Sequence, residues 1–209
     1  MEEKQIHDDL AAIRSVMERS SKFISLSGLS GILAGVYALI GAGIAYLILN
    51  GQPVERTEIK IFEPFPSISS TVLYLMIIAS AVLIASVLTG YILTKSKAKR
   101  KGQAIWGHIS RSLLFYMAVP LVSGGILIFI LLLHRHYGIV SGASLIFYGL
   151  SLVSASNFTF TLVKYLGLCE IALGLIAACL PGYGLLFWAI GFGVLHIIYG
   201  SLMYLRYDR

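Results

Sequence analysis

Six long apolar runs, separated by short polar segments, make up most of the chain. An α-helix rises about 1.5 Å per residue, so roughly 20 apolar residues cross the hydrocarbon core of a bilayer. Each run is long enough to do so. The pattern therefore predicts an all-α, polytopic integral membrane protein with a six-transmembrane-helix bundle as a single domain over residues 23–209. The predicted spans are about 23–49, 69–94, 112–133, 138–156, 161–180 and 185–205.

Residues 1–22 have a different pattern. Apolar residues recur there at helical spacing within a charged segment, at Ile6, Leu10, Ile13 and Met17. This pattern is typical of a short amphipathic helix that lies on the membrane surface or packs under the bundle. A solvated helical tail is the alternative interpretation.

The composition excludes an ordinary soluble domain. Hydrophobic residues make up 57% of the chain and charged residues 12%, whereas soluble proteins carry about 25% charged residues. We therefore expect the lipid bilayer to be the solvent for most of this chain.

The basic residues lie at the ends of the apolar runs, which argues against nucleic-acid binding despite the net charge of +6. With both termini cytoplasmic, 13 of the 16 Lys and Arg residues fall inside and the other three, Arg56, Lys60 and Arg135, fall outside. The positive-inside rule favours this topology. The strongest basic run is predicted to be a cytoplasmic loop that also attracts anionic lipid headgroups: Lys95, Lys97, Lys99, Arg100 and Lys101. Compact loops and the lack of a visible targeting signal favour a bacterial inner membrane.

A row of small residues follows one face of the first span. Small side chains let helix backbones approach closely, so the row predicts a tight helix contact within the subunit or between subunits of a homo-oligomer. The row consists of Gly28, Gly31, Gly35, Ala38, Ala42 and Ala45.

The fifth and sixth spans each carry one ionisable residue near mid-depth. Glu170 shares a face with Gly167 and Gly174, and His196 shares a face with two further packing glycines, Gly193 and Gly200. Both polar groups should therefore point into the bundle. An ionisable residue at that depth is a functional-site hypothesis by default.

Glu170 and His196 are predicted to meet, directly or through one water. The turn at residues 181–184 makes their spans antiparallel neighbours, with the two side chains at similar depth. An unpartnered carboxylate in hydrocarbon is costly, and a carboxylate beside an imidazole can share a proton. The alternatives are a hydrogen bond that only fixes helix register, and separate placements without contact.

The fourth span adds hydroxyl groups on one face, at Ser141, Ser144, Tyr148 and Ser151. Such groups bond across helices, satisfy their own backbone or line a wet cavity. The sequence hypothesis for a binding site comprises Glu170, His196, Ser144, Tyr148 and Ser151.

The sequence assigns no catalytic residue, metal or cofactor. His134 and His136 form only a weak metal signal, no aspartate lies inside a span, and no phosphate-binding loop or GxSxG motif is present. An enzyme is therefore disfavoured.

The sequence leaves two hypotheses for the function. The first is a transporter of a small solute, ion or proton through a midplane Glu170/His196 site. The second is a non-transporting scaffold, sensor or regulatory subunit that associates through the first span.

Overall fold

The computed structural model describes residues 27–51, 69–100 and 106–208. It confirms six helices that are long and apolar enough to cross a membrane. The amphipathic helix predicted for residues 1–22 lies outside the described residues. The first five spans are α2 (Gly28–Gly51), α3 (Ser70–Arg100), α4 (His108–Leu133), α5 (Tyr137–Ala155) and α6 (Thr161–Cys179), with a 3-10 turn, η1 (Ser156–Phe158), after α5.

Two helix ends differ from the prediction. The sequence predicts a loop from Lys95, but α3 continues to Arg100. Lysine and arginine are good helix formers, and positive charge in a last turn interacts favourably with the exposed carbonyl groups. The third span is predicted to start at residue 112, but α4 begins at His108 and so includes Arg111. Helix therefore extends further into the basic segments than hydropathy alone indicates.

The sequence predicts one regular α-helix over residues 185–205 for the sixth span. The structure instead divides this span into four segments. These are α7 (Gly184–Trp188), the π-helix η2 (Ala189–Leu195), α8 (His196–Met203) and a second π-helical segment, η3 (Tyr204–Asp208). A π-helix is wider than an α-helix and rare, and it often marks a functional position. Here it comes immediately before His196.

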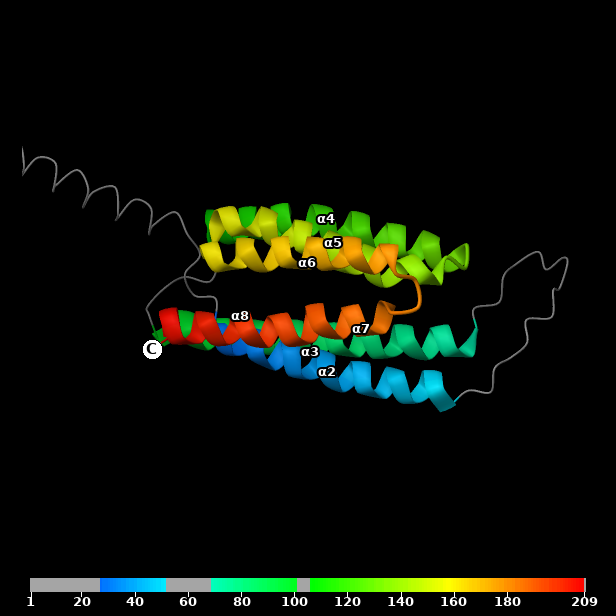
Figure 1. Cartoon of the computed structure of the whole chain (residues 1–209). Coiled ribbons are helices and arrows are strands. Elements are labelled where there is room, and N and C mark those ends of the chain that lie inside the picture. Colours follow the sequence, from blue (N-terminus) through cyan, green and yellow to red (C-terminus); the bar gives the residue numbers. More distant parts are fainter. Residues whose placement is uncertain (1–26, 52–68, 101–105, 209) are drawn as a thin grey trace, which may run out of the picture.

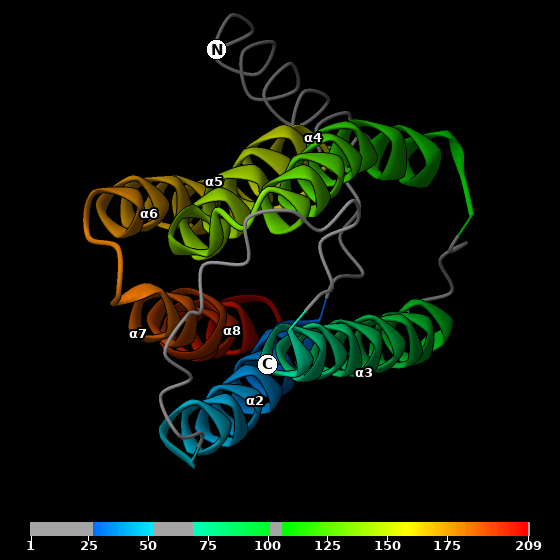
Figure 2. The ribbon, with the colours of Figure 1, turned by 90° about the vertical axis from the view of Figure 1, so that its right-hand side faces the viewer.

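The helices form two layers (Figure 2). One layer contains α4, α5 and α6, with α5 in the centre, and the other contains α3, α2 and the sixth span, with α2 in the centre. Successive spans are antiparallel (Figure 1). The sixth span packs against α5 and α6, and so joins the layers. One layer therefore consists of the third, fourth and fifth spans, and the other consists of the first, second and sixth spans.

Glycine pairs set the closest helix approaches. In one layer Gly142 of α5 lies against Gly174 of α6, and Gly149 lies against Gly167. A Cβ atom on Gly149 would lie 2.6 Å from the Gly167 carbonyl oxygen. Side chains larger than hydrogen would therefore force these two helices apart.

The small-residue face of the first span is used in the same way, within the chain. Gly28 and Gly31 lie against Gly200, and Gly35 lies against Gly193. Ala38, on the same face, is buried. From the sequence, this face could contact either another helix of the same chain or a partner subunit. In the structure the sixth span packs against it.

We predict that Gly35→Ala destabilises the protein. A Cβ atom there would lie 2.6 Å from the Gly193 carbonyl oxygen and 2.7 Å from Ile197 Cγ1, and overpacking of this kind costs about 1–3 kcal/mol. Gly43→Ala on the same helix is the control, because a Cβ atom there has nothing within 4 Å. The measurement is the free energy of unfolding in detergent. Equal stability of the two variants would contradict the packing.

Candidate functional site

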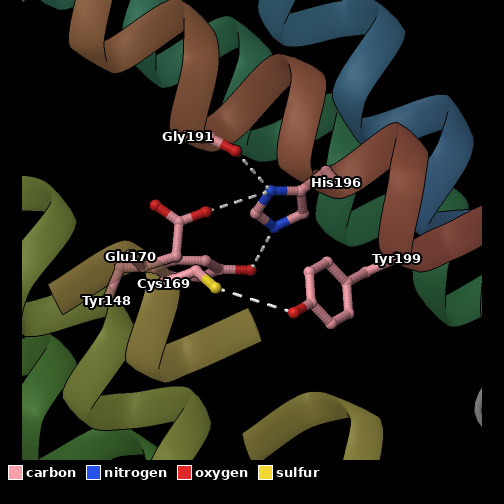
Figure 3. A network of polar contacts seen from close by, with 6 residues as sticks. All are labelled: Tyr148, Cys169, Glu170, Gly191, His196 and Tyr199. Carbon is pink, nitrogen blue, oxygen red and sulfur yellow. Dashed lines mark hydrogen bonds and ion pairs between the residues drawn. The ribbon is translucent and has the colours of Figure 1, made fainter. Parts of the chain in front are cut away.

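Three polar side chains from three helices meet where the two layers touch (Figure 3). The His196 ring, at the start of α8, lies between Tyr148 of α5 and Glu170 of α6. His196 Nε2 is 2.8 Å from the Tyr148 hydroxyl oxygen, and His196 Nδ1 is 3.4 Å from Glu170 Oε1. Glu170 has no exposed surface, and His196 is buried. We call these three residues the polar cluster.

A backbone carbonyl fixes which ring nitrogen of His196 carries a proton. His196 Nδ1 lies 3.0 Å from the Gly191 carbonyl oxygen, and a carbonyl oxygen only accepts hydrogen bonds. Nδ1–H is therefore the donor, and in the neutral ring Nε2 accepts from the Tyr148 hydroxyl. Gly191 precedes His196 by five residues, a separation that matches the i to i+5 period of η2.

The Glu170 carboxyl group has no such fixed donor. Among the described residues, neither of its oxygens has a hydrogen-bond partner within ordinary geometry. His196 Nδ1–H is the nearest charged or chargeable group, and it is shared with the Gly191 carbonyl group. An ionised carboxylate in such a place is stable only beside a cation, and otherwise it is neutral.

The cluster therefore has two forms without net charge. In one, Glu170 is ionised and His196 is an imidazolium. In the other, Glu170 is protonated and His196 is neutral. The two differ in the position of one proton, which is on Glu170 in the neutral form and on His196 Nε2 in the ion pair, because Nδ1 carries its own proton in both. Either form holds one exchangeable proton.

Gly191 makes room for the cluster. A Cβ atom at this position would lie 2.5 Å from Glu170 Oε2, and it would also clash with the Leu145 side chain. The absence of a side chain thus allows the carboxyl group to lie against the sixth span. Sequence reasoning missed Gly191, although a glycine at 191 next to the packing glycine at 193 was the available signal.

The two serines of the predicted site lie outside the cluster. Ser144 Oγ donates a hydrogen bond to the Ser141 carbonyl oxygen at 2.8 Å, so its partner lies in its own helix, α5. Ser151 Oγ donates to the Met117 carbonyl oxygen of α4 at 2.9 Å. The hydroxyl face of α5 is therefore divided, with only Tyr148 directed at His196.

An aromatic row on the sixth span leads away from the cluster. The Phe192 ring centre lies 5.0 Å from that of Tyr148 and 6.1 Å from that of His196. Trp188 follows on the other side, 5.2 Å from Phe192. This arrangement was not predictable from the sequence, because the row depends on how α5 packs against the sixth span.

A cavity of about 370 Å³ lies between the layers and begins at Trp188. Glu170 does not line it. On α5 the lining residue nearest in sequence to the cluster is Ser144, and on the sixth span it is Trp188. The described lining residues include no charged side chain, come from both layers and are mostly apolar: Gly41, Ala42, Ala45, Leu49, Val72, Leu75, Met76, Ile78, Ala79, Ile128, Leu132, Tyr137, Val140, Ser141, Ser144, Gly184, Leu185 and Trp188.

Comparison of the chain with protein-family models, curated proteins and solved structures finds no match. Within the described residues, no group of three or more His, Cys, Asp or Glu side chains could hold a metal ion. The function is therefore argued from the polar cluster and the cavity.

We predict that the neutral form of His196 is protonated at Nδ1. Nitrogen NMR of protein carrying ¹⁵N-labelled histidine distinguishes the two ring nitrogens, and the variant His196→Leu assigns the signal. Tyr148→Phe should shift the Nε2 resonance, because it removes the hydroxyl group, while Nδ1 stays protonated. A neutral ring protonated at Nε2 would contradict the contact with the Gly191 carbonyl group.

Proposed function

We propose that the chain is an integral membrane protein of a bacterial inner membrane with both termini in the cytoplasm. Large apolar side chains are exposed along α3 and α4, such as Leu83, Ile92, Phe115 and Val122. An exposed apolar surface of this size is unfavourable in water and favourable in lipid.

The distribution of charge supports the proposed orientation. The C-terminal end of α3, the N-terminal ends of α4 and α6, and the end of the sixth span share one end of the bundle (Figure 1). These segments carry most of the described basic residues, and Arg135 follows α4 at the opposite end. Positive charge on the cytoplasmic side would also attract anionic lipid headgroups to α3, at Lys95, Lys97, Lys99 and Arg100. Lys101, the last of the predicted run, lies outside the described residues.

We propose that the protein binds and releases a proton at the polar cluster, and that this exchange serves the transport or binding of a small solute. The observation that carries the proposal is the fully buried Glu170 carboxyl group, 3.4 Å from His196 and without a hydrogen-bond donor of its own. Ionisable residues inside membrane helices are costly and mark proton relays and solute sites.

The polar cluster could couple the position of the proton to the contacts between the two layers. Neutral His196 accepts a hydrogen bond from Tyr148, whereas the imidazolium donates one to Tyr148. The contact between His196 and Glu170 changes at the same time from a neutral pair to an ion pair. Tyr148 and Glu170 belong to one layer and His196 to the other. Movement of the proton between Glu170 and His196 therefore changes the bonds that hold the layers together.

A non-transporting sensor or regulatory subunit is a second candidate. It is supported by the packing around Glu170, whose oxygens have no exposed surface and do not line the cavity. A proton-dependent change in layer contacts would then act on a partner. Association through Gly31 and Gly35 is not part of this proposal, because the sixth span covers both residues.

We predict that Glu170→Gln abolishes proton exchange across the membrane. The protein is reconstituted in vesicles that contain a pH-sensitive dye, and proton flux is followed under an imposed potential. The amide has nearly the shape of the carboxyl group but does not exchange a proton at ordinary pH, so the flux should fall by about tenfold or more.

Lys164→Gln is the matched control, since it removes a charge from the end of the same helix and should keep the wild-type flux. Flux that survives Glu170→Gln would contradict the proposed site. Wild-type flux no greater than that of empty vesicles would contradict transport, and would favour the sensor.

A further inference from the structure

We propose that Glu170 is reached from the cavity between the layers, and that the Phe192 ring is the barrier between the cavity and the polar cluster. This inference rests on the proposed function, since it takes Glu170 as the site that exchanges the proton. It adds the direction of access, the residue that controls access, and the class of molecule admitted.

The first argument is the position of the Phe192 ring. Trp188 lines the cavity, Phe192 contacts Trp188, and Phe192 also contacts both Tyr148 and His196. Trp188 in the cavity wall and Phe192 behind it thus lead from the cavity to two residues of the polar cluster, and Phe192 is the ring that contacts the cluster. A change of the Phe192 rotamer would open this path without moving a helix.

The second argument is that the opposite end of the bundle is filled. On that side of the cluster Cys169 Sγ of α6 lies 3.6 Å from the Tyr199 hydroxyl oxygen of α8. Beyond it, Phe160, Val163 and Met203 form a buried apolar core. The Phe160 ring also stacks on Tyr207, with the ring centres 4.1 Å apart. Access from the cavity therefore passes the Trp188 and Phe192 rings, whereas access from the other end meets a packed core.

The cavity also restricts what can enter. Among the described residues no charged side chain lines it, so an ion beside them would lose its hydration without compensation. The layers converge at the sixth span, and among the described residues α3 packs extensively only against α2. The side between α3 and α4 is thus not sealed by helix packing, and Figure 2 shows these two helices at the same edge of the two layers. We infer that the molecules admitted are uncharged and largely apolar.

An uncharged, apolar carbodiimide tests this route. Dicyclohexylcarbodiimide adds the O–H group of a carboxylic acid across one of its C=N bonds, and the adduct rearranges to a stable N-acylurea. Glu170 is the only acidic residue between positions 64 and 207, so its modification is followed by mass spectrometry of the corresponding peptide. The experiment uses the full chain in vesicles.

Phe192→Ala is expected to increase the rate of Glu170 modification by about tenfold or more, because it removes the barrier. Phe187→Ala on the same span is the control and should leave the rate unchanged, since the ring that contacts Trp188, Tyr148 and His196 is that of Phe192. In the Phe192→Ala background, Ala79→Phe fills the cavity and should return the rate towards that of wild type. Ala81→Phe, two residues further along α3 and outside the lining, should not. A cationic water-soluble carbodiimide should react more slowly than the apolar reagent in every variant.

An unchanged rate in Phe192→Ala, or an equal effect of the two α3 substitutions, would overturn the route. If Phe192→Ala does not fold, Phe192→Leu and the Ala79→Phe/Ala81→Phe pair in the wild-type background give the same comparison. Failure of this inference is distinct from failure of the proposed function. Labelling that ignores Phe192 while Glu170→Gln abolishes proton flux refutes the route alone, whereas labelling that follows Phe192 without any effect of Glu170→Gln on flux refutes the function.

Discussion

The structure depends on the need of buried polar groups to find partners within the chain. A carboxyl group and an imidazole at mid-depth in an apolar bundle have no water to bond with. His196 resolves this by contacting Tyr148, Glu170 and the Gly191 carbonyl group together. These contacts join two helix layers whose other contacts are mostly apolar. The glycine pairs act within each layer, where they let the helix backbones pack closely.

The two ends of the bundle differ, and this difference gives the cluster a direction. Towards Trp188 a cavity lies between the layers, and towards Phe160 and Met203 the structure is closely packed. A proton-exchanging group with access from one side at a time is the basic requirement of both coupled transport and proton sensing. What distinguishes the two functions is whether the packed end ever opens, and this depends on how strongly the proton state of His196 changes the contacts between layers.

Much of this structure follows from the sequence. Length and hydropathy predict the six spans, and the tight turn between the last two spans places Glu170 near His196 at equal depth. The hydroxyl face of α5 indicated Tyr148, but it also indicated Ser151, which instead bonds to α4. The π-helix before His196 was not predictable, because its width is set by packing against other helices. For the same reason the row of glycines on the first span was compatible with either a partner subunit or the sixth span, and only the fold shows which.

The most direct test of the Glu170–His196 contact is a double-mutant cycle with Glu170→Met, His196→Leu and the double variant. Each single substitution should lower the free energy of unfolding in detergent, because His196→Leu leaves the Glu170 carboxyl group without a partner in an apolar interior and Glu170→Met removes one of the three groups that His196 contacts. The double variant should be less destabilised than the sum of the two, with a coupling energy above about 0.5 kcal/mol. Additive effects would contradict the contact, and with it the proton site and the coupling of that site to the two layers.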